Sequence, residues 1–273
     1  MPLQLDVQKH SLIRPNHCSL KRQLLQLYRA AIRGDEYVYT SGSIKKAIVM
    51  LSIPMVLEMA MESLFALVDA YFVAKVSPDA VATVGLTEAV ITLVYAIAIG
   101  ISTAPVAMIA RYIGQKDQAN ASRVAKQAIY MAIGVSFILG IPGVIYEEDI
   151  LRMMGGSETW IASGKNYTRL LFGSNAVIML LLLLNGIFRG AGDAAYAMRA
   201  LWLANGINII LDPIFIHGFG PIPAMGVTGA AVATTIGRGI GVAFQLYILF
   251  GGRGTIQLRA GGWRLDWGIL KRL

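Results

Sequence analysis

Long apolar runs follow one another along most of the chain, and each is interrupted by only a few polar side chains. A helix rises about 1.5 Å per residue, so it needs about 20 residues to cross the hydrocarbon core of a bilayer. Six runs are long enough, and they predict transmembrane helices over residues 48–73, 84–109, 125–145, 170–188, 195–216 and 227–250. We therefore expect an all-α integral membrane protein, a bundle of six transmembrane helices.

The composition agrees with a lipid environment. Hydrophobic residues make up 56% of the chain, charged residues only 15%, and the mean hydropathy is +0.60. A soluble domain carries about 25% charged residues, so the low charge argues against an ordinary soluble fold. The single cysteine, Cys18, cannot form a disulfide framework, and the three histidines show no metal-ligand spacing. We expect no bound cofactor.

The charges alternate along the chain in a way that sets an orientation. Lysines and arginines, which give a formal net charge of +8, gather before the first run, between the second and third, around the fourth connection, and after the sixth. The loop after the third run is acidic, and the loop after the fifth is nearly uncharged. By the positive-inside rule both termini are cytoplasmic, in a plasma membrane such as a bacterial inner membrane. Basic residues at the ends of apolar runs indicate membrane anchoring rather than nucleic-acid binding.

The same pattern divides the chain into three parts. Residues 1–43 are expected to form a cytoplasmic N-terminal tail, and residues 44–251 the six-helix transmembrane lobe. Residues 252–273 mix aromatic, aliphatic and basic side chains, which predicts an amphipathic segment on the cytoplasmic face.

Carboxylates inside the apolar runs are the residues most indicative of function. A charged side chain at the middle of a bilayer costs about 2.5–3.5 kcal/mol, and it persists mainly where it lines a cavity. Asp69 and Asp212 each follow an apolar stretch, and Asp212 precedes Pro213, which loosens the helix there. Asn205, Asn208 and Asp212 are spaced three and four apart, so they share one helix face. With an amide on the fourth run, Asn185, they predict an inward-facing polar cluster.

Simpler explanations remain open for several of these residues. Asparagines in membrane helices often only hydrogen-bond a neighbouring helix, which contributes about 1 kcal/mol. Glu58 and Glu62, one turn apart, either line the same cavity or pair with Arg238, and the sequence does not decide between these. Arg189 and Asp193 flank three small residues, which predicts a cytoplasmic turn held by an ion pair.

Four motifs resemble those of multidrug and toxic compound extrusion (MATE) transporters. Residues 67–74 (LVDAYFVA) resemble the end of that family's helix one, and residues 185–193 (NGIFRGAGD) its turn after helix four. Residues 211–216 (LDPIFI) are similar to its helix-five motif in the DinF-like branch, and residues 229–234 (GAAVAT) to the start of its helix six. The likeness covers residues 44–273, in the right order and spacing, and corresponds to the family's N-terminal half.

The resemblance implies one lobe of a twelve-helix MATE-type transporter, not an enzyme. It implies a cation-coupled antiporter for multidrug efflux, which exports amphipathic or cationic small molecules and uses a proton or sodium ion for coupling. It assigns the coupling and binding site to Asp69, Asn185, Asn208, Asp212 and Thr234, with Asp69 and Asp212 as candidate sodium ligands. The family's passage lies between two lobes, so residues 252–273 would lead to a missing second lobe, or a homodimer would supply it.

Three other functions were weighed against this one. A flippase for a lipid-linked precursor would be expected to have a strongly cationic cavity, whereas only Arg238 lies deep in a predicted helix. An intramembrane enzyme would need a nucleophile with a base, or a metal set, within the helices. A truncated, non-transporting gene product would share every motif.

Overall fold

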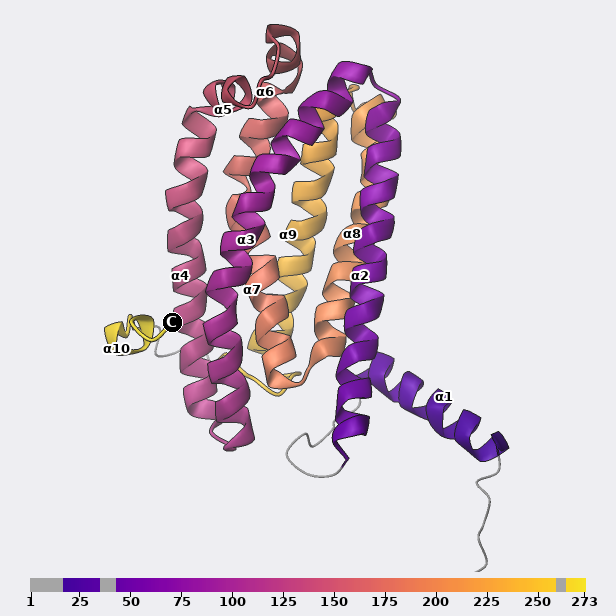
Figure 1. Ribbon diagram of the computed structural model, residues 1–273, viewed down its shortest axis with the longest axis vertical. Helices are drawn as coiled ribbons and strands as arrows, with labels where there is room; N and C mark the ends of the chain where they lie inside the picture. Colours follow the sequence, from indigo (N-terminus) through magenta and orange to yellow (C-terminus); the bar gives the residue numbers. More distant parts are fainter. Residues whose placement is uncertain (1–16, 35–42, 259–263) are drawn as a thin grey trace, which may run out of the picture.

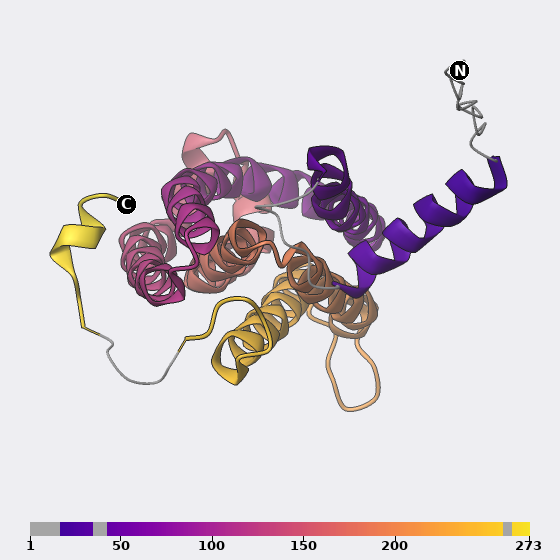
Figure 2. The same cartoon turned by 90° about the horizontal axis from the view of Figure 1, so that it is seen from below.

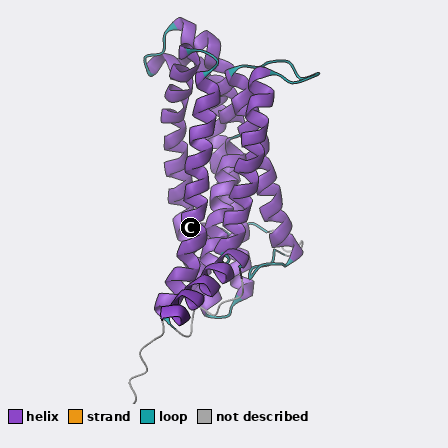
Figure 3. Cartoon of the chain, turned by 90° about the vertical axis from the view of Figure 1, so that its right-hand side faces the viewer, coloured by secondary structure: helices purple, strands orange, loops and turns teal. Residues whose placement is uncertain are grey.

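Residues 17–34, 43–258 and 264–273 are described by a computed structural model, in which the chain forms a helical bundle (Figure 1). The described residues contain no strand, and Figure 3 shows helices throughout, with loops mostly at the two ends of the bundle. The elements are α1 His17–Arg33, α2 Ile44–Ala74, α3 Pro78–Gly114, α4 Gln118–Ile145, α5 Glu147–Met153, α6 Glu158–Gly173, α7 Asn175–Ala191, α8 Ala194–His217, α9 Val227–Gly251 and α10 Trp267–Leu270.

Five of these helices, α2, α3, α4, α8 and α9, are each long and apolar enough to cross a membrane. The fourth predicted helix, over residues 170–188, is not one straight span. Residues Gly164–Gly173 of α6 and all of α7 meet at a bend of 48°, and together they make the sixth span. The break falls at Gly173 and Ser174, a pair of residue types at which helices commonly kink. Ser174 Oγ accepts a hydrogen bond from Thr235 Oγ1 at 3.0 Å, which ties the break to α9.

The two ends of the bundle differ in charge. The start of α2 and the α3–α4 and α7–α8 turns lie at the lower end in Figure 1, where α1 also joins the bundle. This end therefore carries the basic loops of the sequence. The acidic residues Glu147, Glu148, Asp149 and Glu158 belong to α5 and the start of α6, at the opposite end. The separation agrees with the alternation on which the predicted orientation rests.

The two terminal regions contain structure that the apolar runs alone did not predict. Residues 17–33 of the expected tail form α1, whereas residues 1–16 and 35–42 lie outside the described part. Residues 252–258 form an irregular strap across the lower end, in which Ile256 and Leu258 are 1% exposed. Thr255 donates to both oxygens of the Asp193 carboxylate, from its N–H at 2.6 Å and its hydroxyl at 2.9 Å. In the described remainder, 264–273, only α10 is helical.

Close packing of α8 against α9 depends on glycine. A Cβ atom at Gly229 would lie 2.4 Å from the carbonyl carbon of Phe215 on α8, and one at Gly237 would lie 2.6 Å from the carbonyl oxygen of Ala204. Those contacts are to backbone, which cannot rotate away. Small residues at such points let membrane helices approach until their backbones touch.

Replacing Gly229 by alanine is therefore expected to destabilise the bundle by about 1–3 kcal/mol, the range for overpacking a tight contact. Gly239→Ala on the same helix is the matched control, because nothing lies within 4 Å of a Cβ built there. The measurement is the thermal unfolding midpoint of both variants in detergent. Equal midpoints would show that the α8–α9 contact tolerates a methyl group.

Candidate functional site

A polar cluster with a buried centre, the aspartate cluster, joins α2, α8 and α9. It consists of Asp69 on α2, Asn208 and Asp212 on α8, and Thr234 on α9. Asn208 Nδ2 donates a hydrogen bond to Thr234 Oγ1 at 3.0 Å. Asp212 is 0% exposed, and the charge of Asp69 lies close enough to act on it. The structure therefore brings together four of the five site residues predicted from the sequence.

Four oxygen atoms of this cluster lack a hydrogen-bond partner among the described residues. They are both carboxylate oxygens of Asp212, one of Asp69, and the amide oxygen of Asn208, and all four are buried. An ionised carboxylate that is sealed from water without a donor is strongly unfavourable. Such a group is stable only if it is protonated or if a cation sits against it.

The local sequence of α8 explains how these oxygens meet. Asn208 and Asp212 are four residues apart, so their side chains leave the helix on the same face. Pro213 follows at once, and it has no N–H to donate to the carbonyl four residues earlier. The described residues contain no group of three or more His, Cys, Asp or Glu side chains that could hold a metal ion. The aspartate cluster offers two carboxylates with an amide and a hydroxyl, which are oxygen ligands of the kind that hard cations prefer.

The fifth predicted site residue, Asn185, lies in a different network. Its amide nitrogen donates to Glu58 Oε1 at 3.3 Å, and its amide oxygen accepts from Gln245 Nε2 at 2.6 Å. Arg189, one turn further along α7, lies 3.5 Å from the same oxygen of Glu58. Arg189 therefore pairs with Glu58 instead of the expected Asp193. The Asp193 carboxylate instead accepts two hydrogen bonds from Thr255 of the strap, while the Glu58 carboxylate lies beside both Asn185 and Arg189 of α7.

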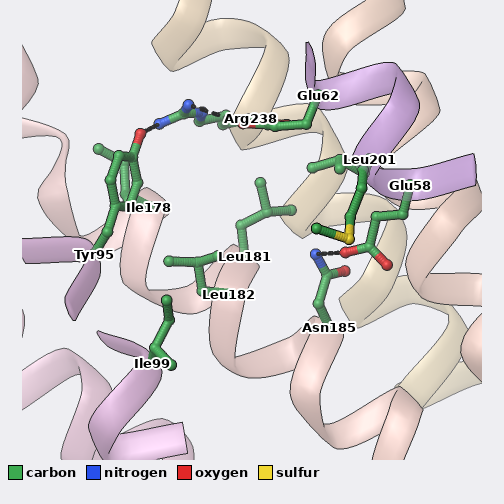
Figure 4. Close-up of a pocket in the computed structure, with 11 residues that line it drawn as sticks. Glu58, Glu62, Tyr95, Ile99, Ile178, Leu181, Leu182, Asn185, Leu201 and Arg238 are labelled. Carbon is green, nitrogen blue, oxygen red and sulfur yellow. Dashed lines mark hydrogen bonds and ion pairs between the residues drawn. The ribbon is translucent and has the colours of Figure 1, made fainter. Parts of the chain in front are cut away.

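A cavity of about 330 Å³ opens beside this second network (Figure 4). Glu58, Glu62, Asn185 and Arg238 supply its polar lining, and the remainder is mostly apolar, with residues of α2, α3, α7 and α8. Arg238 donates to the hydroxyl of Tyr95 at 2.5 Å and lies 3.8 Å from Glu62. Both alternatives left open for the glutamates are therefore realised, because they line one cavity and Glu62 also pairs with Arg238.

Arg238 connects the cavity electrostatically to the aspartate cluster. Its charge acts on Asp69 and on Glu88 of α3, a residue that the sequence did not single out. Glu88 also accepts a hydrogen bond from the hydroxyl of Tyr167 at 3.4 Å. Gln245 was missed too, although a lone amide inside the apolar stretch 242–250 could have pointed to it.

The geometry is that of a membrane bundle with a set of buried, unpartnered oxygens and a separate cavity, and the family comparison identifies what kind of bundle it is. The MatE family model matches residues 54–214, more than half of the chain. The chain belongs to the MatE family. Two features predicted from the sequence are thereby confirmed: the MATE resemblance and the all-α membrane fold.

Relatives of this MatE chain include the probable multidrug resistance protein NorM of Thermotoga maritima, 30% identical over 80% of the chain and 47% of that protein. The FAD transporter of Shewanella oneidensis is 26% identical over 79% of the chain and 48% of that protein. The chain thus spans about half the length of the curated relatives it matches. These relatives are transporters, which fits a transport role better than an enzymatic one.

Solved structures of MATE transporters resemble this bundle closely. An outward-facing multidrug resistance MATE transporter superposes with a TM-score of 0.77 at 33% identity, over 89% of this chain and 51% of that one. A MOP-superfamily transporter from Pyrococcus furiosus gives 0.78 at 32% identity, over 89% of this chain and 52% of that one. The present bundle therefore has the fold of about half of such a transporter.

The second network predicts a stability effect that is separate from transport. Asn185→Leu would remove the partner of Gln245 Nε2 and one partner of Glu58, at a cost of about 1–3 kcal/mol for each orphaned buried group. Asn166→Leu on α6 is the control, because Asn166 is exposed and makes none of these bonds. Thermal unfolding of the two variants in the same detergent compares them. An Asn185→Leu protein as stable as the control would mean that this network does not hold α2, α7 and α9 together.

Proposed function

We propose that the chain forms one lobe of a cation-coupled antiporter that exports amphipathic or cationic small molecules. The observation that carries the proposal is the set of four buried, unpartnered oxygens on Asp69, Asn208 and Asp212. A proton or a sodium ion is the ligand such a set would take, and no further cofactor is needed. Membership of the MatE family supports transport, and the motif at residues 211–216 supports the DinF-like branch.

Coupling would work through the packing of three helices. The aspartate cluster draws its oxygens from α2 and α8, and Asn208 bonds across to Thr234 on α9. Binding or release of a cation changes the charge of a site whose oxygens are buried from solvent. The helices would therefore favour one arrangement with the cation bound and another without it, which is how an ion biases a two-state transporter.

The cavity supports cationic rather than anionic cargo. Its polar lining contains two carboxylates, Glu58 and Glu62, against one guanidinium, Arg238. Its apolar side chains suit the hydrophobic part of an amphipathic molecule. Glu58 pairs with Arg189 and Glu62 with Arg238, so the cavity is not strongly cationic, and the flippase alternative has less support.

We propose that export also requires a second six-helix lobe, because a passage between lobes cannot be built from this bundle alone. A longer polypeptide or a second copy of the chain would supply it. The basic end of the bundle would face the cytoplasm of the cell, with the protein in its plasma membrane.

Asp212→Asn tests the coupling site. The amide keeps the size of the side chain but cannot be ionised, so we expect cation binding to fall at least about tenfold, the loss that corresponds to roughly 1.4 kcal/mol. The measurement is ²²Na⁺ binding, and proton release on binding, with the purified chain in detergent. Efflux of a fluorescent cationic dye from cells expressing the chain is then measured for the same variant.

Asp149→Asn is the matched control, because Asp149 is an exposed carboxylate of α5 that pairs with Arg152 at the surface. It should bind cation and support efflux like the unmodified chain. Undiminished cation binding by Asp212→Asn would contradict the assignment of the site. Normal cation binding by the unmodified chain without any dye efflux would instead point to the second lobe.

A further inference from the structure

The N-terminal helix α1 has a charge pattern that the transport site does not use. Its 17 residues include Lys21, Arg22, Arg29 and Arg33 and no acidic residue. It joins the lower, basic end of the bundle and points away from it in Figure 1. Figure 2, seen from below, shows most of α1 outside the perimeter of the bundle. For a bundle embedded in a bilayer, lipid occupies the region beyond that perimeter.

The C-terminal end of α1 is fixed to the bundle by specific contacts. Arg199 of α8 donates to the carbonyl oxygens of Ile32 at 3.2 Å and Arg33 at 2.5 Å, so a cation satisfies the last carbonyls of α1. Ala31 is 2% exposed, and Gly34 turns the chain with a φ of 69° against Ala195. These contacts hold α1 at one height along the bundle.

Apolar and basic side chains of α1 lie on different faces of the helix. Leu27 and Ala31, four residues apart, lie on the same face, and Ala31 is the buried one. Leu25 and Tyr28 extend this apolar sector but are 56% and 43% exposed. The three arginines are seven and four residues apart and therefore form one exposed stripe on the other side: Arg22, Arg29 and Arg33.

We propose that α1 lies on an anionic lipid surface, with Leu25 and Tyr28 inserted at the boundary between headgroups and acyl chains. The arginine stripe would then contact the phosphates of acidic headgroups. Three observations support lipid as the occupant rather than a protein partner: α1 has only basic charges, its exposed apolar side chains adjoin them, and its anchor places it beside the bundle at the basic end. Amphipathic helices of this composition bind membranes through apolar area together with attraction to anionic lipid.

The test uses the full chain in lipid nanodiscs and does not depend on transport. In a Cys18→Ser background, an environment-sensitive fluorophore is attached at Tyr28→Cys on the apolar sector or at Gln26→Cys on the polar side. The discs contain phosphatidylcholine alone or an equal mixture with phosphatidylglycerol. With phosphatidylglycerol, the probe at position 28 should be quenched by doxyl lipids and shielded from aqueous iodide, and the probe at position 26 should behave in the opposite way.

Charge removal identifies the lipid contact. Changing Arg22, Arg29 and Arg33 to glutamine should lower the preference for phosphatidylglycerol by roughly fivefold for each arginine removed. The matched control changes Arg111, Lys116 and Arg123 to glutamine, since these basic residues are exposed at the same end of the bundle and the net charge falls equally. This control variant should leave the doxyl-lipid and iodide quenching of the position 28 probe unchanged.

Two results would overturn the proposal. Strong iodide quenching of the probe at position 28 in both kinds of disc would mean that α1 stays in water whatever the lipid. Protection of position 28 from iodide and doxyl lipids alike would mean that protein, not lipid, covers this face.

Discussion

A carboxylate enclosed in a membrane bundle must find a hydrogen-bond donor, a proton or a cation, because neither lipid nor water can stabilise its charge there. Asp212 has no donor for either oxygen among the described residues. Its burial follows from the contact of α8 with α9, in which Gly229 and Gly237 let the two backbones meet. A larger residue at either glycine would separate the helices and admit lipid or water to the carboxylate. The close packing and the unsatisfied charge are therefore two parts of one arrangement.

Arg238 extends this constraint across the bundle. A single guanidinium bonds Tyr95, lies beside Glu62 at the cavity, and acts electrostatically on Asp69. The charges of Glu88 and Arg238 both act on Asp69, Glu88 more strongly, so the aspartate is not electrostatically isolated from the residues around Arg238. The aspartate cluster and the cavity are separate sets of residues, and Arg238 lines the cavity while its charge reaches Asp69. That is the physical basis on which occupation of one could affect the other.

Sequence periodicity located the residues on α8 but not their partners on other helices. The spacing of Asn208 and Asp212 fixes a common face from helix geometry alone. Asn185 satisfied the same criterion of a polar residue in an apolar run, but the neighbour its helix face meets is set by tertiary packing, and it bonds Glu58 instead. The Gly173–Ser174 pair is a local signal for the bend, but its hydrogen bond to Thr235, 61 residues away in the chain, is not visible in the sequence. A search for long apolar runs also overlooked α1, whose signal is the alternation of apolar and basic faces rather than hydropathy.

Two positions of weakened helix bonding lie close in the chain to residues of the aspartate cluster: Pro213 inside the continuous helix α8, and the bend at Ser174. Pro213 follows Asp212 directly, and the bend at Ser174 is bonded to Thr235, the neighbour of Thr234. Irregular backbone at membrane depth is tolerated only where protein encloses it or where it lines a polar cavity. Each interruption also removes helical hydrogen bonds that would otherwise keep the segment straight, so the helices can bend there at lower cost. On the proposed function, a cation held by Asp69 and Asp212 would act beside Pro213, where α8 lacks one helical hydrogen bond, so a change of charge there would be expressed as a change in helix packing.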